Sequence, residues 1–403
     1  MMSDDFDAAI GAALEAEINA KSGKPADDED KGAPEADAEQ PEAAVAAEPE
    51  AEPQSLADRV HYEKRGNLGV ISLHRPEALN AIDLDMVRAI DGYVSEADAD
   101  DEVLTIVLWS PEGRAFCAGG DIRQLWEWGR GGKRELFLFY REEYQLNQRL
   151  ATLRTPYLSL MDGIVMGGGA GLALHAPHRV VSETVTFAMP EVGIGFVPDV
   201  GSTKLLSGMP GRTGRYLALT GERISGADMI WGGLADTVVP REQHANLLDR
   251  LADGETATEV TEAFGVDADE SALSGLAETI DETFEGSVEA VLDALDAFEG
   301  ERSEWAAATA ATIRKQCPFS VLGTEGLMER AAGASLEDCL VNEFRAATRV
   351  VQRQDFYEGV RAAVVDKDRK PRWRPSSLDA VDRAELATLF EPSPMRDVSF
   401  PER

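Results

Sequence analysis

Strand-like and helix-like segments alternate through the middle of this chain, and this alternation limits the possible folds more than any other feature. Residues 60–76 alternate apolar and polar side chains around Gly66–Asn67, which predicts a hairpin. Residues 78–100 repeat apolar side chains at four-residue spacing and predict a helix. Residues 101–110 form a continuous apolar run, typical of a strand covered on both faces. Together these patterns indicate an α/β layer architecture.

The alternation divides the chain into three parts. Predicted strands recur at 156–163 and 178–183, and after residue 245 the pattern becomes helical. We therefore expect a tail at 1–56, an α/β core at 57–245, and a mostly helical C-terminal region at 246–403.

The N-terminal segment differs in composition from the rest. Between Ser3 and Ala57 sixteen acids stand against three lysines, and such a segment buries too little apolar surface to offset its ordering entropy. We expect residues 1–56 to form a disordered acidic tail. The whole chain has a formal net charge of −35, which opposes binding to nucleic acids and to anionic membranes.

The cysteines and the apolar runs bear on location. Cys117, Cys317 and Cys339 are widely spaced and match neither a zinc motif nor a disulfide framework. The sequence has no run of about 18 apolar residues, so no membrane span is predicted. The acidic start of the chain resembles neither a secretory signal nor a transit peptide. We expect free thiols and a cytoplasmic protein.

A glycine-rich turn follows the predicted strand 101–110, in the segment GRAFCAGGDI (113–122). Gly119 and Gly120 permit positive φ angles and close approach of a ligand, and Asp121 is suited to cap the helix that follows. Backbone N–H groups at such a turn can stabilise an oxyanion. A tight connection with no further role explains the same residues equally well.

A second glycine-rich turn occurs in DGIVMGGGAGL (162–172), again between a predicted strand and a helix. Three consecutive glycines disfavour an ordinary helix start by about 0.5–1 kcal/mol each, so this position requires bare backbone. Close helix–strand packing is one explanation, and an N–H group directed at a ligand is the other. The segment is not a dinucleotide fingerprint or a P-loop.

Two acids stand in the apolar segment FAMPEVGIGFVPDVG (187–201). Glycines and Pro198 prevent a continuous helix here, so Glu191 and Asp199 are expected on a loop of special shape. A lone acid after proline is usually a helix cap or a solvated turn. An apolar setting, in contrast, raises the pKa of a carboxyl and suits it to proton transfer or nucleophilic attack.

Other polar residues give weaker signals. The helical segment 137–150 has an aromatic stripe and two adjacent acids, a pattern that usually means core packing with a solvated face. The five histidines form no metal-binding spacing, so no metal is expected. The sequence has no G-x-S-x-G motif, so it gives no support for a serine hydrolase.

Taken in order, these motifs resemble the crotonase, or enoyl-CoA hydratase/isomerase, superfamily. Six segments that span most of residues 60–375 contribute to the resemblance: HRPEALNAID (74–83), AFCAGGDI (115–122), GIVMGGGAGL (163–172), FAMPEVGIGFVPDVG (187–201), ALTGERISGADMIWGGLAD (218–236) and EGVRAAVVDKDRKPRW (358–373). It implies a spiral of ββα units with C-terminal helices. It also implies an acyl-CoA substrate, no separate cofactor, and possible homo-oligomers, although a long insert at 246–300 could block the usual interfaces.

The resemblance also implies the site residues. The thioester carbonyl is expected between the backbone N–H groups of Gly120 and Gly168, with Ala118 beside them in the substrate site. Three segments look most like the 3-hydroxyisobutyryl-CoA hydrolase branch: REEY (141–144), MPEVGIGFVPDVG (189–201) and DFYEGVRAAVVDKDRKPRW (355–373). In that branch Glu143 is expected to complete the substrate site.

Within the superfamily, the acids at three positions indicate whether this chain is more similar to the hydrolases or to the hydratases. Hydratases of this superfamily have a glutamate at the position that Gly171 occupies here. The hydrolase branch instead pairs the equivalents of Glu191 and Asp199. We expect hydrolysis of 3-hydroxyisobutyryl-CoA, a step of valine catabolism. Glu191 would act as nucleophile or general base, and Asp199 would bind the substrate 3-hydroxyl.

Two other functions remain as alternatives. One is a different reaction of the superfamily, such as enoyl-CoA hydration or isomerisation, and the other is a non-catalytic acyl-CoA-binding scaffold. The residue after Pro76 is often basic in the superfamily and contacts CoA phosphates, but here it is Glu77. Arg75, Arg123 and Lys204 are the candidates for that role.

Overall fold

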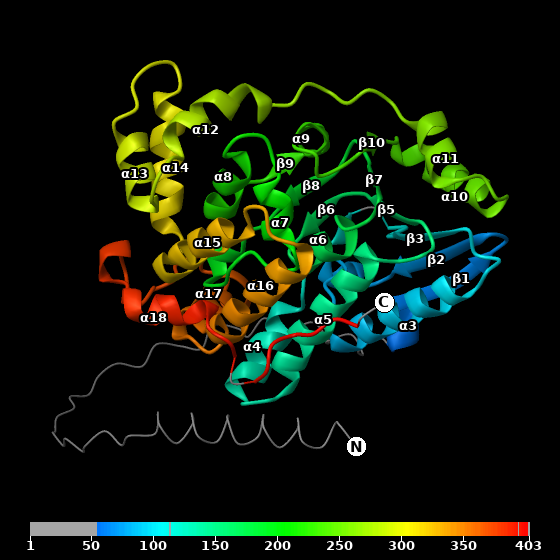
Figure 1. The fold of residues 1–403 in the computed structure, drawn as a ribbon, viewed down its shortest axis with the longest axis horizontal. Helices are drawn as coiled ribbons and strands as arrows, with labels where there is room; N and C mark the ends of the chain where they lie inside the picture. Colours follow the sequence, from blue (N-terminus) through cyan, green and yellow to red (C-terminus); the bar gives the residue numbers. More distant parts are fainter. Residues whose placement is uncertain (1–54, 113, 394, 402–403) are drawn as a thin grey trace, which may run out of the picture. The chain divides into compact units, whose positions relative to one another are not determined.

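The computed structural model describes residues 55–112, 114–393 and 395–401 (Figure 1). The predicted disordered tail, residues 1–56, lies outside the described residues apart from its last two positions. Residues Leu56 to Arg403 group as one compact unit.

A six-stranded sheet forms the base of the core. Its strand order is β1-β2-β3-β5-β7-β10, with β1 (Val60–Arg65), β2 (Leu68–Leu73), β3 (Thr105–Trp109), β5 (Tyr157–Met161), β7 (His178–Val181) and β10 (Thr237–Val238). The predicted hairpin is confirmed, because β1 and β2 pair antiparallel around Gly66, whose φ is +55°. The other pairings in this sheet are parallel.

A four-stranded sheet with the order β4-β6-β8-β9 accompanies the first one. Its strands are β4 (Ala115–Cys117), β6 (Ile164–Met166), β8 (Thr186–Ala188) and β9 (Ile224–Ser225). The chain alternates between the sheets, since β3 leads to β4, β5 to β6 and β7 to β8, and a helix follows β4 and β6. This repetition is the predicted spiral of ββα units.

Helices cover both faces of the six-stranded sheet. Helix α3 (Leu84–Ala99) contacts β1, β2 and β3. Helices α10 (His244–Ala252) and α11 (Ala257–Phe264) lie on the opposite side of these strands (Figure 1). Leucines of α10 share one buried apolar cluster with Leu68, Val107 and Leu158. Because both faces are covered, every residue of β2 is buried, as expected for parallel strands.

The predicted helix at 78–100 begins six residues later than expected. Leu79 and Asn80 have positive φ angles, and Asp83 caps α3 by accepting a hydrogen bond from the Met86 N–H. The Asn80 side chain donates to Ser110 and to the Ala115 carbonyl, and these bonds stabilise the loop. The apolar periodicity therefore extended the prediction too far, because Ile82 pairs with Gly120 instead of continuing the helix.

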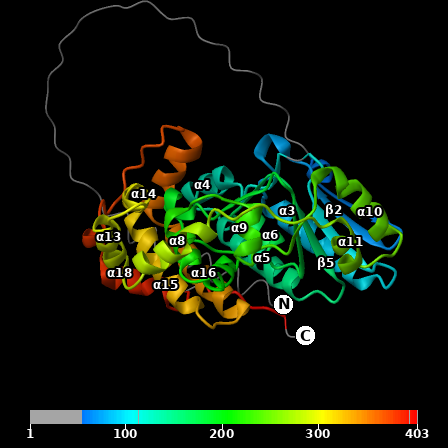
Figure 2. The ribbon, with the colours of Figure 1, turned by 90° about the horizontal axis from the view of Figure 1, so that it is seen from above.

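Further α-helices lie along the described chain. Those before residue 245 are α2 (Leu56–Arg59), α4 (Ile122–Arg130), α5 (Glu135–Ala151), α6 (Gly168–Ala173), α7 (Ser202–Ser207), α8 (Thr213–Thr220) and α9 (Gly226–Trp231). Those after it are α12 (Ala277–Thr283), α13 (Val288–Asp296), α14 (Ser303–Lys315), α15 (Pro318–Ala331), α16 (Leu336–Val350), α17 (Gln354–Val360) and α18 (Arg383–Ala387). Figure 2 shows α10 and α11 at one end of this unit and α13 and α14 at the other.

A connection between α11 and α12 spans the distance between these ends (Figure 1). The Asp228 carboxylate on α9 anchors it by accepting hydrogen bonds from the Ser271 hydroxyl and the Leu273 N–H. The predicted helical block after residue 245 is thus tied to the core by a motif residue of the SGAD segment.

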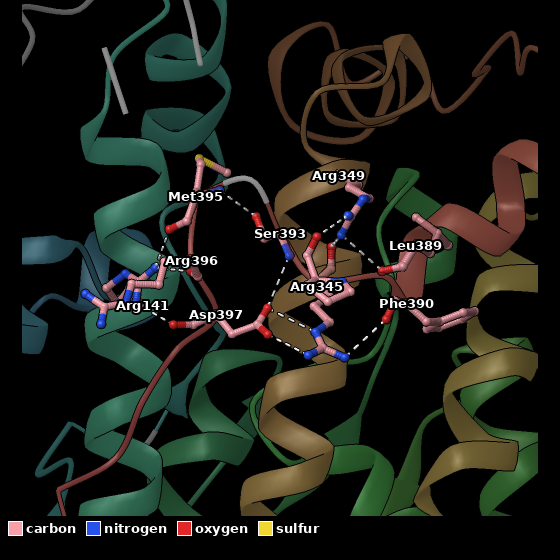
Figure 3. Close-up of polar contacts among 10 residues, drawn as sticks. Arg141, Arg345, Arg349, Leu389, Phe390, Ser393, Met395, Arg396 and Asp397 are labelled. Carbon is pink, nitrogen blue, oxygen red and sulfur yellow. Dashed lines mark hydrogen bonds and ion pairs between the residues drawn. The ribbon is translucent and has the colours of Figure 1, made fainter. Parts of the chain in front are cut away.

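The C-terminal segment, described at residues 389–393 and 395–399, crosses α5 and α16, which also pack on each other directly. Arg141 of α5 donates to three consecutive carbonyls, those of residues 395, 396 and 397 (Figure 3). Arg345 of α16 forms a two-pronged ion pair with the Asp397 carboxylate (Figure 3). The segment thereby joins the two helices that flank the candidate site.

Candidate active site

The two glycine-rich turns lie side by side in the structure. Strands β4 and β6 are parallel neighbours, and each is followed by consecutive glycines before the next helix, α4 or α6. Gly119 has a φ of +112° and Gly167 a φ of +48°, conformations that L side chains rarely adopt. Glycine is therefore required at Gly119 and Gly167 because of their backbone conformation.

The predicted oxyanion donors are close in space. A Cβ atom added to Gly168 would lie 3.3 Å from the backbone nitrogen of Gly120. Within the described part of the chain, neither the Gly120 N–H nor the Gly168 N–H donates to a backbone carbonyl outside its own element. Two backbone donors near one point are the arrangement that stabilises a developing oxyanion.

Two glutamates lie over the second glycine turn. Glu143 of α5 places its Oε1 atom 2.4 Å from the position of a Cβ on Gly168, and Glu191 places its Oε1 atom 3.1 Å from a Cβ on Gly167. Glu143 Oε1 and Glu191 Oε2 are buried and have no hydrogen-bond partner among the described residues. Two carboxyl groups with unsatisfied oxygens therefore border the bare backbone of the turn.

Asp199 reaches the same place from a loop. The short 3₁₀ helix η2 (Glu191–Ile194) ends at Gly195, whose φ is +72° and where a Cβ would lie 2.4 Å from the Asp355 carbonyl oxygen. The loop then brings Asp199 to α5, and the Tyr144 hydroxyl donates to Asp199 Oδ2 over 2.7 Å. The GIGFVP stretch thus folds both acids back toward one another.

A residue far along the chain stabilises the end of this loop. Glu343 of α16 is fully buried and accepts hydrogen bonds from the Gly201 N–H at 2.6 Å and the Thr203 N–H at 3.1 Å. These N–H groups belong to the start of α7, where a carboxylate is favourable. Glu343 therefore fixes the backbone that follows Asp199.

A small cavity of about 80 Å³ collects these groups. Every site residue expected from the sequence lines it, namely Ala118, Gly120, Glu143, Gly168, Glu191 and Asp199. Its other walls are mostly apolar and include Leu125, Phe139, Tyr140, Ile194 and Phe196. The arrangement provides two backbone donors and three carboxyls in a small space with mostly apolar walls.

Burial determines the protonation of the three carboxyls. It raises the pKa of Asp199 to about 8, although the hydrogen bond from Tyr144 opposes this shift. Burial also raises the pKa of Glu191 well above its ordinary value, and the nearby Asp199 adds to the effect. Glu143 shifts in the same direction, from burial first and then from Asp199 and Glu191. A carboxyl with a pKa of about 8, such as that of Asp199, can exchange protons near neutral pH.

These shifts predict how stability depends on pH. The folded state binds the Asp199 proton more tightly than the unfolded chain, where the ordinary pKa is 3.8. Its contribution to stability is complete below about pH 4 and is lost as the pH rises toward about 8. We expect the Tm of Asp199→Asn to fall less than that of the wild type between about pH 5 and about pH 8 in thermal melts. Parallel curves for the two proteins would contradict this assignment.

The position of the hydratase glutamate is closed. A Cβ on Gly171 would lie 2.6 Å from Asn147 Nδ2 and 2.7 Å from Val200 Cβ. Distances below 3.0 Å require the surrounding atoms to move, so no longer side chain fits at 171 without a shift of α5 or of the Asp199 loop. Helix α6, which contains Gly171, therefore contributes no glutamate to the site.

The candidates for CoA phosphate contacts are engaged within the protein. The Arg75 guanidinium donates to Asp121 Oδ2 at 2.8 Å, immediately after Gly120. Lys204 donates to the Ala334 carbonyl at 2.6 Å, and Arg123 to the Val364 carbonyl at 3.2 Å. Of the three, Arg75 bonds to the residue that directly follows an expected oxyanion glycine.

Two functional contacts were missed by sequence reasoning. The sequence pattern predicts that the aromatic stripe of α5 is core, yet Tyr144 donates a hydrogen bond to Asp199. The only sequence signal for this contact is the place of Tyr144 in REEY. Glu343 gave no signal at all, because it stands in an ordinary amphipathic helix. The three cysteines are free and buried, as predicted.

Two negative findings concern the described residues alone. They include no group of three or more His, Cys, Asp or Glu side chains placed to hold a metal ion. No helix among them is long and apolar enough to cross a bilayer.

Solved structures share this fold. A carnitinyl-CoA dehydratase from Mycobacterium thermoresistibile superimposes with a TM-score of 0.79 at 35% identity, covering 83% of this chain and 97% of that one. An enoyl-CoA hydratase from Rhodobacter sphaeroides gives a TM-score of 0.78 at 37% identity, covering 85% of this chain and 99% of that one. These similarities support the predicted crotonase-like architecture.

Sequence comparison agrees with the fold. The mitochondrial 3-hydroxyisobutyryl-CoA hydrolase of Danio rerio is 38% identical over 352 residues, which are 85% of this chain and 91% of that protein. The family model for enoyl-CoA hydratase/isomerase matches residues 68–390. Since the glycine turns, the acid cavity and both kinds of similarity coincide, this chain belongs to the enoyl-CoA hydratase/isomerase family.

Proposed function

We propose that this protein hydrolyses the thioester of 3-hydroxyisobutyryl-CoA to the free acid and CoA. One observation carries the proposal: the buried side chains of Glu143, Glu191 and Asp199 share a cavity with two glycine turns, while position 171 is closed. The curated relative from Danio rerio has a name that describes the same reaction. The substrate is a short, branched 3-hydroxyacyl-CoA, which suits a small cavity with apolar walls.

In the proposed reaction the thioester carbonyl oxygen accepts hydrogen bonds from the N–H groups of Gly120 and Gly168. Glu191 either attacks the carbonyl carbon or removes a proton from the water that attacks it. The carbonyl oxygen becomes an oxyanion, which the two N–H groups stabilise. The C–S bond then breaks, and CoA leaves as the thiol once it has received a proton. Asp199 binds the substrate 3-hydroxyl.

The two roles of Glu191 differ in where oxygen atoms go. Direct attack forms a mixed anhydride between the Glu191 carboxyl and the acyl group, and water then cleaves it. If water attacks the Glu191 carbon of the anhydride, a single turnover in ¹⁸O-labelled water places label in the Glu191 carboxyl and an enzyme oxygen in the product. General-base action puts the water oxygen in the product alone and leaves Glu191 unlabelled. Label in the peptide containing Glu191, measured by mass spectrometry, would therefore demonstrate direct attack, and trapping of the anhydride with hydroxylamine tests for it when water attacks the acyl carbon instead.

The titles of the two solved structures name dehydratase and hydratase reactions, so hydration is the competing function. The two-glutamate hydration expected from the family requires a carboxyl at position 171. Here Asn147 and Val200 occupy the space next to Gly171. Asp199, held by Tyr144, supplies a carboxyl on the other side of Glu191. We therefore favour hydrolysis over hydration.

A thiol-release assay tests the proposal. We expect rapid release of CoA thiol from 3-hydroxyisobutyryl-CoA and a kcat/KM at least about 10²-fold lower for isobutyryl-CoA, because a site that binds a hydroxyl rejects the analogue lacking it. Conversion of an enoyl-CoA to its 3-hydroxyacyl product without thiol release would indicate a hydratase. Tight CoA binding in calorimetry with no turnover of any thioester would indicate a scaffold.

The reaction would place the protein in valine catabolism. We propose the cytoplasm as its location, since its three free cysteines suit a reducing compartment, whereas the relative from Danio rerio has a name that describes a mitochondrial protein. Cell fractionation followed by the thiol-release assay tests this location. The proposed partner is the acyl-CoA substrate, without a separate cofactor.

A further inference from the structure

The cavity contains a tyrosine hydroxyl that has no role in the reaction described so far. Tyr140 of α5 lines the cavity and is 2% exposed. Its hydroxyl is buried and has no hydrogen-bond partner among the described residues. Leaving a buried hydroxyl unpaired is unfavourable, and a phenylalanine would fill the same space without it. The hydroxyl therefore requires an explanation.

Packing keeps the Tyr140 ring in place. It stacks on Phe196 with ring centroids 5.4 Å apart and meets the edges of Phe139 and Tyr144 at 5.4 and 6.2 Å. Such aromatic contacts restrict rotation of the ring. The ring, and with it the hydroxyl, is thus held in one position in the wall of the cavity.

The hydrogen bond to Asp199 comes from Tyr144, on the next turn of α5, and not from Tyr140. Tyr144 follows Tyr140 by four residues, so both lie on one face of the helix. The Tyr144 hydroxyl already donates to Asp199 Oδ2. Burial raises the pKa of the Tyr140 phenol well above its ordinary value, and Asp199 is the charged group that adds most to this shift, followed by Glu143. Tyr140 thus remains a neutral donor in the wall of the cavity that Asp199 also lines.

An alcohol group is the chemical complement of this pair. A hydroxyl offers one donor and two acceptor lone pairs, so a buried one needs both an acceptor and a donor from its site. The Asp199 carboxyl supplies an acceptor, and the Tyr140 hydroxyl supplies a donor. A purely hydrocarbon acyl chain would leave the Tyr140 hydroxyl unpaired and Asp199 with only the hydrogen bond from Tyr144.

We propose that the Tyr140 hydroxyl donates a hydrogen bond to the 3-hydroxyl oxygen of the acyl group, and that with Asp199 it selects 3-hydroxyacyl thioesters over their unsubstituted analogues. This inference rests on the proposed hydrolase function and adds a specificity residue to it. The thioester carbonyl is left to the backbone of Gly120 and Gly168, so Tyr140 acts on the acyl chain and not on the reacting carbon.

The experiment compares Tyr140→Phe with the wild type on two thioesters. For 3-hydroxyisobutyryl-CoA we expect kcat/KM to fall about 10-fold, the effect of losing one good hydrogen bond. For isobutyryl-CoA we expect no loss, because that substrate has no oxygen for the phenol to bind. The preference for the hydroxylated substrate should therefore shrink about 10-fold.

Tyr93→Phe is the matched control. Tyr93 lies on α3 and stacks against Tyr62 outside the cavity, so removing its hydroxyl should leave the substrate preference unchanged. The Tm of Tyr140→Phe should be no lower than that of the wild type, since the lost hydroxyl has no partner in the described protein.

Each other outcome overturns a specific statement. An equal loss on both thioesters would mean that Tyr140 acts on the carbonyl or the catalytic acids. An unchanged preference, or a lower Tm, would remove Tyr140 from substrate recognition. A wild-type protein that hydrolyses neither thioester would overturn the proposed function itself, before Tyr140 is considered.

Discussion

Replacing Glu191 by glutamine is expected to lower kcat on 3-hydroxyisobutyryl-CoA by about 10³-fold or more. In either proposed role Glu191 supplies the electron pair that drives attack on the carbonyl, and a loss of a positioned base or nucleophile has effects of about 10²–10⁴-fold or larger. The amide has nearly the same shape, so the backbone donors and the other acids should remain in place. Initial rates of thiol release at saturating substrate measure the effect.

The stability of the Glu191→Gln variant provides a second readout. Burial raises the pKa of Glu191, so ionising it in the folded state is unfavourable, and an uncharged amide should leave the Tm at neutral pH equal or higher. Glu96→Gln on the exposed side of α3 is the control and should keep full activity. A Glu191→Gln enzyme with an undiminished rate would eliminate Glu191 as the reactive carboxyl.

Replacing Gly168 by alanine is the second change with a large expected effect. The added Cβ would lie 2.4 Å from Glu143 Oε1 and 3.3 Å from the Gly120 nitrogen. Both the carboxyl and the oxyanion donors must then shift. Since the loss of one oxyanion donor lowers rates by about 10²–10³-fold, we expect kcat to fall by at least that amount.

Gly92→Ala is the matched control for this change. A Cβ at position 92 of α3 meets nothing within 4 Å, and alanine favours a helix over glycine by about 1 kcal/mol. We expect normal activity and a slightly higher Tm. If Gly168→Ala retained nearly normal activity while folding normally, the second glycine turn could not be the oxyanion hole.

The glycine turns and the two loop acids were predictable because their signals are local. Consecutive glycines after a strand, and acids placed between prolines and glycines, are unusual patterns that a stretch of a few residues already reveals. Each pattern indicates a backbone conformation that is not an ordinary helix or strand. The structure explains the glycines, because Gly119 and Gly167 have positive φ angles.

The contacts that complete the site were not predictable from local patterns. Tyr144 and Asp199 are 55 positions apart, and Glu343 is 142 positions from Gly201. Nothing in the composition of either helix marks these side chains, because their roles depend on which helices meet in three dimensions. The same reason explains the misplaced start of α3, where Ile82 follows the helical period but pairs with Gly120.

The segment that crosses α5 and α16 affects when the site matures during protein synthesis. Asp397 is 256 positions from Arg141 and 52 from Arg345, and the cavity residues all precede it. A nascent chain still on the ribosome can thus contain the complete set of acids and glycines without the segment that joins these two helices. Catalytic competence of the growing polypeptide should therefore lag behind the synthesis of its reactive groups.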